Sequence, residues 1–185
     1  CFNSAYLGRS IEETNSVDHF SHNSVDWSDN LLADLLADGK IFGVCFGRDE
    51  VGPRALCNRS LIAGSHDTVL KDKLNRIKRR QHWRPVAPVT SKQHTHLITD
   101  EGRNCDLRFM NIAKQASEIF KLNCPAAVHL DGSIRAQIIE ADHPLSSVID
   151  SYFQKTGAPA ILNTSFNIGD EPIVSSQWDA FKTFS

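Results

Sequence analysis

Helical and strand-like hydrophobic patterns alternate over the first eighty residues. Residues 1–25 are polar with few apolar side chains, which is typical of a linker or lead-in. After them, a Ser-Asp pair at 28–29 can cap a helix whose leucines recur at helical spacing, and Gly39 can end it. The apolar run 41–46 predicts a buried strand. Residues 66–80 place apolar side chains on one helical face and basic ones mostly on the other, which predicts a basic amphipathic helix.

Short strands and one further long helix are predicted in the second half. Apolar segments at 126–130 and 136–140 are joined through an Asp-Gly-Ser turn, which predicts a β-hairpin. Pro144 suits the start of a helix with apolar residues at helical spacing, and Gly157 lies where a C-terminal cap belongs. A strand is expected at 160–162. Helices that alternate with short strands predict an α/β domain built on a mixed, partly parallel sheet.

The composition, 185 residues with 41% hydrophobic and 23% charged, is that of one globular domain with its own core. Because the chain has 20 basic and 22 acidic side chains, general polyanion binding is excluded and any anion site must be local. No long apolar run and no signal-peptide pattern occurs, so we expect neither a membrane span nor export. Five cysteines without a Cys-x-x-Cys pair indicate neither a disulfide framework nor a zinc ribbon, and a reducing cytoplasm fits best. The chain begins with Cys1 and stops at Ser185 within a helical pattern, so we expect a piece of a longer protein.

Two arginine-containing clusters lie in segments stiffened by proline. In the segment 52–60, a Gly-Pro pair can hold Arg54 and Arg59 near a phosphate or carboxylate, although surface salt bridges are the simpler interpretation. The second cluster runs from Lys78 to Arg84 and is followed by two prolines. The proline after Arg84 favours an extended backbone there, so the guanidinium is aimed. The concentrated positive charge suits a triphosphate or an RNA backbone, or simply a solvated helix face.

Two polar clusters flank predicted strands further along the chain. Asp131 is foremost a turn residue, whereas Arg135 lies in an apolar strand and needs an anion or a carboxylate there. The segment 162–172 offers hydroxyls, amides and backbone donors directly after a strand, which suits phosphate oxygens but also an ordinary turn. Asp170 and Glu171 are either magnesium ligands or helix-proximal acids.

Several features are weaker. The pairs His19/His22 and His94/His96 lack cysteine or helical glutamate partners, and we interpret them as surface histidines. Cys57 lies beside arginines, which would lower its pKa. Neither a nucleophile elbow nor a Walker phosphate loop is present, so ATP would need another cradle.

Taken in order, four segments closely resemble the C-terminal, YrdC-like half of the O-carbamoyltransferases, the family of the NodU type and of antibiotic carbamoyltransferases. They are GRDEVGPRALCNRSLIA at 47–63, KDKLNRIKRRQHWRPVAPV at 71–89, VHLDGSIRAQ at 128–137 and LNTSFNIGDEPIV at 162–174. The resemblance implies a twisted mixed β-sheet flanked by helices. It also implies two parts, with 1–25 as the lead-in from a missing N-terminal TsaD-like half and 26–185 as the YrdC-like domain.

The resemblance also implies roles for individual residues. Lys78 and Arg84 resemble the basic pair of the YrdC-like domain, and together with Arg54 they are the expected catalytic residues. The expected substrate- or nucleotide-binding residues are Asn58, Arg59, Asp131, Arg135, Asn163, Ser165 and Asn167, of which Ser165 and Asn167 resemble the Ser-x-Asn element.

The activity that the resemblance implies is the formation of carbamoyl adenylate from carbamoyl phosphate and ATP, with magnesium accompanying the nucleotide. The N-terminal half would then pass the carbamoyl group to a hydroxyl of a small acceptor. The metal site belongs to that half, so we assign no metal ligands in this chain. Two departures stand out, since Cys57 replaces a glycine and Arg9 a proline. If φ at residue 57 is positive, the cysteine side chain would crowd the anion loop.

Three alternatives remain open from the sequence. One is a YrdC-type enzyme of transfer-RNA threonylcarbamoyl modification, which uses threonine and bicarbonate. Another is an RNA-binding surface without catalysis, formed by the basic helix and Trp83. The third is a regulatory module that only binds nucleotide. The net charge makes nucleic acid a less favoured partner than carbamoyl phosphate and ATP.

Overall fold

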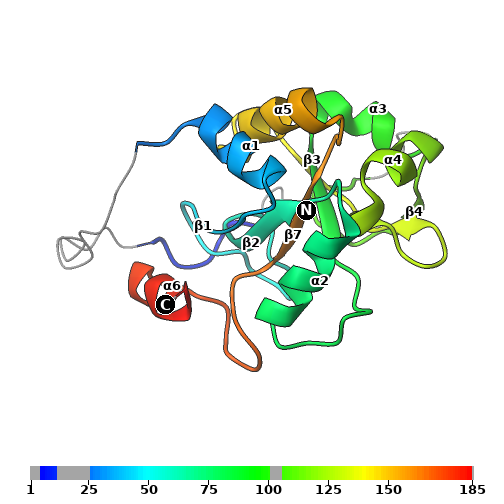
Figure 1. Cartoon of the computed structure of the whole chain (residues 1–185). Helices are drawn as coiled ribbons and strands as arrows, with labels where there is room; N and C mark the ends of the chain where they lie inside the picture. The colour runs from blue at the N-terminus through cyan, green and yellow to red at the C-terminus, as the bar shows by residue number, and fades with distance from the viewer. Residues whose placement is uncertain (1–4, 12–25, 101–105, 185) are drawn as a thin grey trace.

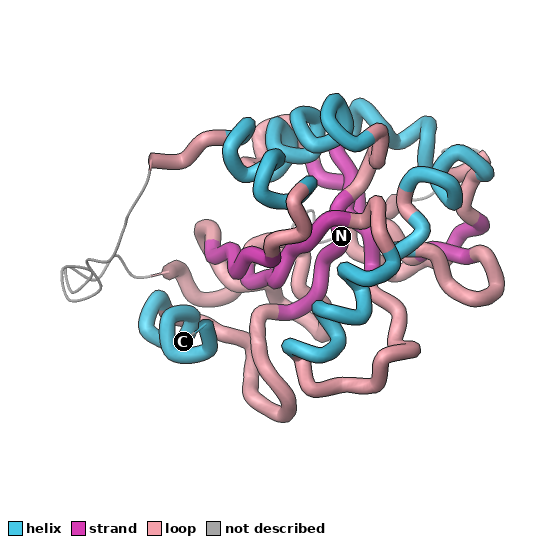
Figure 2. Tube along the Cα trace, viewed as in Figure 1, coloured by secondary structure: helices cyan, strands magenta, loops and turns pink. Residues whose placement is uncertain are grey.

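The computed structural model describes residues 5–11, 26–100 and 106–184, which form a mixed sheet with helices around it (Figures 1 and 2). The described strands are β1 Ile41–Cys45, β2 Arg59–Gly64, β3 Ala87–Ser91, β4 Lys114–Gln115, β5 Ser133–Ile134, β6 Gln137–Ile139 and β7 Ile161–Ser165, of which β4 and β5 form a separate two-stranded sheet. The helices are α1 Asp29–Ala37, α2 Thr68–Ile77, α3 Thr95–Ile98, α4 Glu118–Asn123, α5 Leu145–Thr156 and α6 Gln177–Phe184, with short 3-10 turns η2 Lys92–His94 and η3 Pro125–Ala127.

The main sheet has the order β1-β2-β7-β3-β6, in which β3 and β6 are parallel and the other neighbours antiparallel. Strands β2 and β3 are buried along their whole length. Helices α1 and α5 pack against each other, α5 also covers β3, and α2 packs on β2 and η3 (Figure 1). This is the α/β architecture with a mixed, partly parallel sheet that the hydrophobic pattern predicted.

The predicted helices are confirmed together with their caps. The Ser28 side chain accepts a hydrogen bond from the Leu31 amide at the start of α1, and Gly39 follows its end with φ +74°. Helix α2 is the predicted basic amphipathic helix. Helix α5 begins after Pro144 and ends at Gly157, which also has φ +74°. The strands expected at 41–46 and 160–162 are β1 and β7.

The predicted hairpin between 126–130 and 136–140 is wrong. The turn itself forms, because the His129 amide donates to the Ser133 carbonyl and the Gly132 amide to the His129 carbonyl, both at 2.9 Å. However, Pro125 favours a helical first turn, and the alanines that follow it form η3. The residues on either side then pair elsewhere, β5 with β4 and β6 in parallel with β3.

Strands β2 and β3 were not predicted from the sequence. Strand β2 begins within the segment 52–60, which was interpreted as an anion-binding loop, and β3 begins in the proline-stiffened segment after Arg84. Strand β3 also contains Pro88, which argues against a central strand. The register explains how the proline is accommodated, since pairing with β6 begins only at Val89. No N–H is therefore required of Pro88 on that side.

Residues 5–11, within the predicted lead-in, run along the segment 47–51. Backbone hydrogen bonds of 2.8–3.0 Å connect the two segments, from Val51 to Ala5 at one end and from Ile11 to Gly47 at the other. Gly8 permits this close approach, because a Cβ there would lie 2.6 Å from Cβ of Asp49. The rest of the predicted lead-in, 1–4 and 12–25, lies outside the described residues.

Tyr152 on α5 connects the helix layer to the end of β2, and we expect the Tyr152→Phe variant to be less stable. The tyrosine is fully buried, and its hydroxyl accepts a hydrogen bond from the Ser65 amide at 3.0 Å and lies 2.6 Å from Nδ1 of His66. Removal of the hydroxyl leaves the Ser65 N–H without its partner, so the free energy of unfolding should fall by about 1–3 kcal/mol.

Urea denaturation followed by circular dichroism would measure that difference. Ser147→Ala, on the exposed side of the same helix, is the control and should change the free energy of unfolding by less than about 0.5 kcal/mol. Equal stability of Tyr152→Phe and the wild type would contradict the assigned role of the hydroxyl.

Candidate functional site

The candidate site lies where the carboxyl end of β7 meets the loops that precede β2, β3 and β6. Antiparallel pairing of β7 with β2 and β3, and parallel pairing of β3 with β6, bring these four points to the same edge of the sheet. They enclose a cavity of about 130 Å³ lined largely by polar side chains. Those side chains belong to Arg54, Arg80, Arg135, Asn163, Thr164 and Ser165. Four of the predicted site residues are thus brought together here.

Lys78 immediately follows α2 and is almost fully buried, with 6% of its surface exposed. Its ammonium is surrounded by four oxygens at the end of β7 and just beyond it. The carbonyl and hydroxyl of Ser165 lie at 2.6 and 2.9 Å, and the carbonyl and side-chain oxygen of Asn167 at 3.0 and 2.5 Å. An ammonium has three hydrogens, so these contacts use all of them. Lys78, Ser165 and Asn167, which lie far apart in the sequence, therefore form one cluster.

The pKa of Lys78 is lowered to about 8, chiefly by burial and in addition by the nearby positive charges of Arg80 and Arg84. The same causes, burial and Arg84, lower the pKa of Arg80 to about 10. Three cations are therefore held close enough to disfavour one another. Such an arrangement is stabilised when an anion binds among them.

Arg80 lines the cavity but was not among the site residues that the family resemblance implied. Its Nε donates to the Asn75 side chain at 2.6 Å and one Nη to the Thr164 hydroxyl at 3.3 Å, while the other Nη is buried without a partner among the described residues. Asn75 is fully buried and its amide also donates to the carbonyls of His82 and Arg84, both at 2.9 Å. Asn75 thereby fixes the loop that carries Arg80 and Arg84. For Arg80, its position in the basic segment was the only signal in the sequence.

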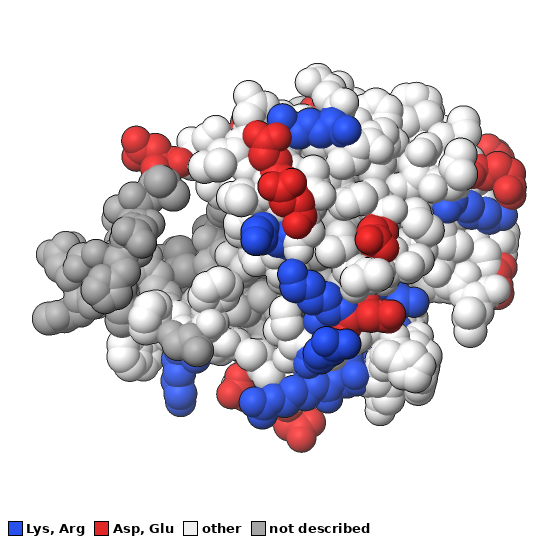
Figure 3. Space-filling view, viewed as in Figure 1, with Lys and Arg blue, Asp and Glu red and all other residues white. Residues whose placement is uncertain are grey.

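Arg54, Arg84 and Arg135 present the remaining positive charge. Arg54 and Arg84 are exposed, whereas Arg135 is half-buried and its Nε has no partner among the described residues. The pKa of Arg135 is lowered by burial first and by Arg54 second, so the two guanidinium groups are neighbours. Figure 3 shows further lysines and arginines gathered over α2, which are its exposed basic face rather than part of the cavity.

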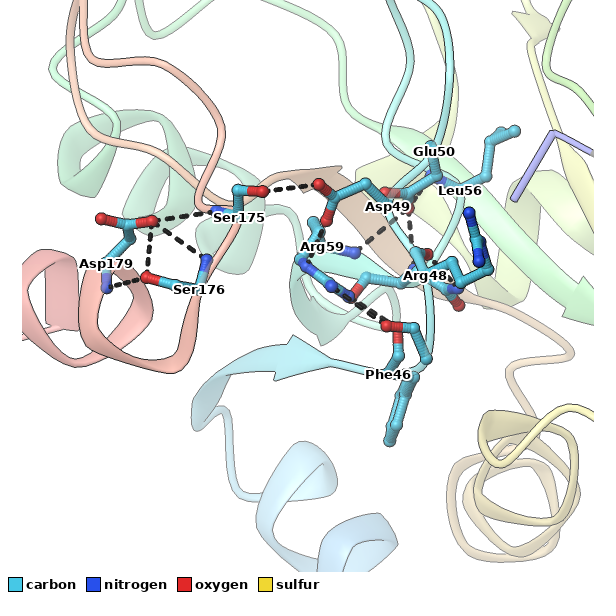
Figure 4. Close-up of polar contacts among 11 residues, drawn as sticks. Phe46, Arg48, Asp49, Glu50, Leu56, Arg59, Ser175, Ser176 and Asp179 are labelled. Carbon is cyan, nitrogen blue, oxygen red and sulfur yellow. Dashed lines mark hydrogen bonds and ion pairs between the residues drawn. The ribbon is translucent and has the colours of Figure 1, made fainter. Parts of the chain in front are cut away.

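Arg59 is a predicted anion ligand whose guanidinium is already held inside the protein (Figure 4). It is 1% exposed, its Nε lies 2.8 Å from the Asp49 carboxylate, and its Nη atoms donate to the carbonyls of Phe46 at 2.6 Å and Gly47 at 3.1 Å. These contacts fix the segment that crosses from β1 to β2. Arg59 therefore supports the loop in this structure and presents no free donor pair to the cavity.

Glu50 organises the same loop from its other side. Its Oε1 accepts hydrogen bonds from the backbone amides of Leu56, Asn58 and Arg59 at 2.7, 2.8 and 3.1 Å. The Asn58 side chain is buried and donates to the Arg48 carbonyl at 2.7 Å. Asn58 is thus placed beneath the loop, outside the lining of the cavity. A glutamate that closes a loop onto three amides has no sequence signature, so this role of Glu50 is not predictable from the sequence.

Cys57 adopts φ +78°, as the replacement of a glycine suggested, and its side chain points into the core. The thiol lies 3.4 Å from Oε1 of Gln137. The expectation of a lowered pKa is wrong, because complete burial raises the pKa of this thiol. Cys45 and Cys124, the other described cysteines, are likewise free thiols with pKa values raised to about 11 by burial.

Asp131 lies in the turn before β5 and not in the lining of the cavity. Its carboxylate accepts hydrogen bonds from the Ser133 amide at 3.0 Å and the Ser133 hydroxyl at 2.7 Å, which hold its pKa below the usual value. This is the Asx-turn arrangement expected of an Asp-Gly turn. Asp170 and Glu171 are exposed.

The interpretation of the paired histidines is wrong for His94. That residue is buried, and its Nε2 lies 3.0 Å from the Asp150 carboxylate, whereas His96 is exposed. His19 and His22 lie outside the described residues. Within residues 5–11, 26–100 and 106–184, no group of three His, Cys, Asp or Glu side chains could hold a metal ion.

A second cavity, of about 450 Å³, shares Pro53 and Arg54 with the first. Its other walls are mostly apolar and include Val51, Leu56 and Phe109. Arg54 thus separates a small polar space from a larger, less polar one.

No helix of the described part is long and apolar enough to cross a membrane.

Comparison with curated proteins identifies relatives among the nodulation proteins. The chain is 40% identical over 138 residues to nodulation protein U of Azorhizobium caulinodans, covering 74% of this chain and 24% of the relative. It is 35% identical over 171 residues to nodulation protein NolO of Bradyrhizobium diazoefficiens, covering 88% and 31%. The chain therefore spans about a quarter to a third of the length of the curated relatives it matches.

Solved structures share the fold at low sequence identity. The crystal structure of T. kodakarensis HypF superposes with a TM-score of 0.58 and 17% identity over 86% of this chain and 20% of that one. A double variant of P. abyssi Sua5 gives a TM-score of 0.58 and 14% identity over 88% and 47%. These matches confirm the expected YrdC-like fold. The family model described as "Carbamoyltransferase C-terminus" matches residues 33–185, and the chain therefore belongs to the carbamoyltransferase C-terminal family.

Proposed function

We propose that this domain forms carbamoyl adenylate from carbamoyl phosphate and ATP, and that another part of the same protein transfers the carbamoyl group to an acceptor hydroxyl. The observation that carries the proposal is the polar cavity at the end of β7, into which Arg54, Arg80 and Arg135 converge beside the buried Lys78. No carboxylate of the described residues forms an ion pair with these four cations. Their charge is therefore available to an anionic ligand.

The proposed reaction has two steps. Carbamoyl phosphate and one water first give carbamate and inorganic phosphate, and a carbamate oxygen then attacks the α-phosphorus of ATP and displaces pyrophosphate. Carbamate is a weak and short-lived nucleophile, so enclosure and fixed positive charge matter more than a general base. The cavity volume of about 130 Å³ suits the carbamoyl group or one phosphate, but not a whole nucleotide.

Unpartnered donors in the cavity support the binding of oxygen-rich anions. One Nη of Arg80 and the Nε of Arg135 are buried without partners, and each would cost stability unless a ligand accepts from it. Lys78 already uses its hydrogens on Ser165 and Asn167, so an anion that contacts it must replace one of those oxygens. We assign to Lys78 the positioning of this segment and a contribution to the positive field.

The neighbouring apolar cavity of about 450 Å³ would hold the nucleoside of ATP, since Arg54 lies in the walls of both cavities. Magnesium, which we expect to be bound to the phosphate oxygens, would neutralise charge on the triphosphate. The proposal also places the reaction in the cytoplasm, where ATP is available.

Mass spectrometry for carbamoyl adenylate, with pyrophosphate assayed in parallel, tests the proposal directly. Nucleotide binding without product would favour a regulatory module, and salt-sensitive RNA binding without nucleotide turnover would favour the RNA-binding surface.

Arg84→Ala should lose most of the adenylation activity while the fold stays intact. The guanidinium is exposed, and its backbone is held by Asn75, so truncation removes charge without opening the core. A well-placed charged donor is commonly worth about 3 kcal/mol in the transition state, which corresponds to a loss of roughly 100-fold in pyrophosphate release. Arg76→Ala, which removes an equal charge from the exposed face of α2, should keep nearly full activity. Full activity of Arg84→Ala would overturn the assignment.

Adenylation should decline as the pH rises through about 8. The pKa of Lys78 is lowered to about 8, so its ammonium is charged below that pH and neutral above it. Neutral lysine loses both its field and one hydrogen of the contacts to Ser165 and Asn167. The measurement is kcat/KM for pyrophosphate release against pH, because this parameter reports the free enzyme. Lys78→Arg should be slower but should shift the decline to higher pH, and a wild-type rate that stays level well above pH 8 would contradict the prediction.

A further inference from the structure

Asn163 on β7 holds an acceptor atom that no described residue uses. The residue is 2% exposed and lines the polar cavity, yet its Oδ1 has no hydrogen-bond partner among the described residues. A buried amide oxygen without a partner normally costs about 1–3 kcal/mol, so the site is built to receive a donor.

The hydrogen-bond network fixes which way this amide points. The Asn163 Nδ2 donates to the Ala55 carbonyl at 3.0 Å and to Oε1 of Gln137 at 3.1 Å. Gln137 is fully buried and is itself oriented by donation from its Nε2 to the Leu56 carbonyl at 3.0 Å. Both series of hydrogen bonds end on backbone carbonyls, which can only accept. A flipped Asn163 amide would therefore place oxygen against oxygen. Both amide hydrogens are therefore used, and only Oδ1 is left for a ligand.

Other side-chain acceptors of the lining are occupied. The Thr164 hydroxyl accepts from Arg80, and the Ser165 hydroxyl accepts from Lys78 while it donates to Asn167. Three buried side-chain atoms of the lining residues thus have no hydrogen-bond partner among the described residues, namely a guanidinium nitrogen of Arg80, the Nε of Arg135 and Oδ1 of Asn163. Because their residues line the same cavity of about 130 Å³, together they would supply two donors and one acceptor to a ligand there. The α- and β-phosphates of a nucleotide have acceptors for the two donors but carry no O–H or N–H at neutral pH, so they have no donor for Asn163.

We propose that Asn163 is the specificity-determining residue that accepts a hydrogen bond from the amine of the carbamoyl group. The carbamoyl oxygens would accept from the arginines, and the planar amine would donate to Oδ1. The inference rests on the proposed function, since it assumes that carbamoyl phosphate enters this cavity. In this role the Asn163 side chain accepts a hydrogen bond, whereas a phosphate ligand would require it to donate one.

The expected consequence is discrimination between an amine and a methyl group of similar size. An acyl phosphate with a methyl in place of the amine fits the same space but leaves Oδ1 buried and unpaired. Sites that satisfy a ligand N–H or O–H reject the analogue without it, and one such loss corresponds to roughly 10- to 100-fold in affinity.

Isothermal titration calorimetry with two stable phosphonates tests this without any turnover. Phosphonoacetamide carries the carbamoyl amine, and 2-oxopropylphosphonate carries a methyl in its place. The wild-type chain should bind phosphonoacetamide about 10- to 100-fold more tightly. Equal affinities, or no binding of either compound, would overturn the proposal.

Asn163→Leu should abolish the preference, because a leucine of similar size offers no acceptor. General damage to the site weakens both ligands alike, so the ratio of the two affinities is the informative readout. Thr164→Val is the matched control, since it removes another polar group of the same wall and should keep the preference. A preference that survives in Asn163→Leu would overturn the proposal. If Asn163→Leu fails to fold by circular dichroism, Asn163→Ala decides, because it removes the same acceptor oxygen without adding a branched side chain and should also abolish the preference.

The product assay for carbamoyl adenylate separates this inference from the proposed function. Adenylate formation with equal phosphonate affinities would leave the reaction standing and remove the role of Asn163. A preference for the amide without adenylate formation would leave the role of Asn163 standing and remove the reaction.

Discussion

The buried ammonium of Lys78 holds together two parts of the chain that nearly ninety positions separate. It sits after α2 and binds the carbonyls and side-chain oxygens of Ser165 and Asn167 after β7. The backbone strengthens the same connection, because the Gly169 amide donates to the Lys78 carbonyl at 3.2 Å. Both walls of the site depend on this joint, since one carries Arg80 and Arg84 and the other carries the end of β7. A buried cation is tolerated there because oxygens replace its water.

Positive charge is crowded at this edge of the sheet, and the fold must hold it there against mutual repulsion. The lowered pKa values of Lys78 and Arg80 record that cost. A buried amide side chain and a half-buried carboxylate fix the loops that carry this charge. Asn75 fixes the loop of Arg80 and Arg84, and Glu50 closes the loop after Arg54 onto its own amides. Because the loops hold these cations in place, the site is preorganised for an anion.

Much of the fold was predictable because it depends on local rules. The caps at Ser28, Gly39 and Gly157 and the amphipathic faces of α1, α2 and α5 are properties of neighbouring residues, and all were found. The hairpin failed because β6 pairs with β3, which lies almost fifty residues earlier. Pairing across that distance leaves no periodic signal between the two segments. The same holds for Pro88, whose place in a central strand depends on where β6 begins.

The candidate site shows a similar division, with residue types predictable and their orientation not. Sequence motifs pointed to Lys78, Arg54, Arg135, Asn163 and Ser165, which the fold brings to one place. They could not distinguish Arg59, which holds a loop, from Arg135, which keeps a free donor, because both are arginines beside strands. That difference comes from the partners each guanidinium meets after folding. A buried group with every hydrogen bond satisfied supports the structure, and one left unsatisfied at a cavity wall is available to a ligand. On this criterion Asn163, interpreted from sequence as one more phosphate ligand, becomes the group best placed to recognise an N–H.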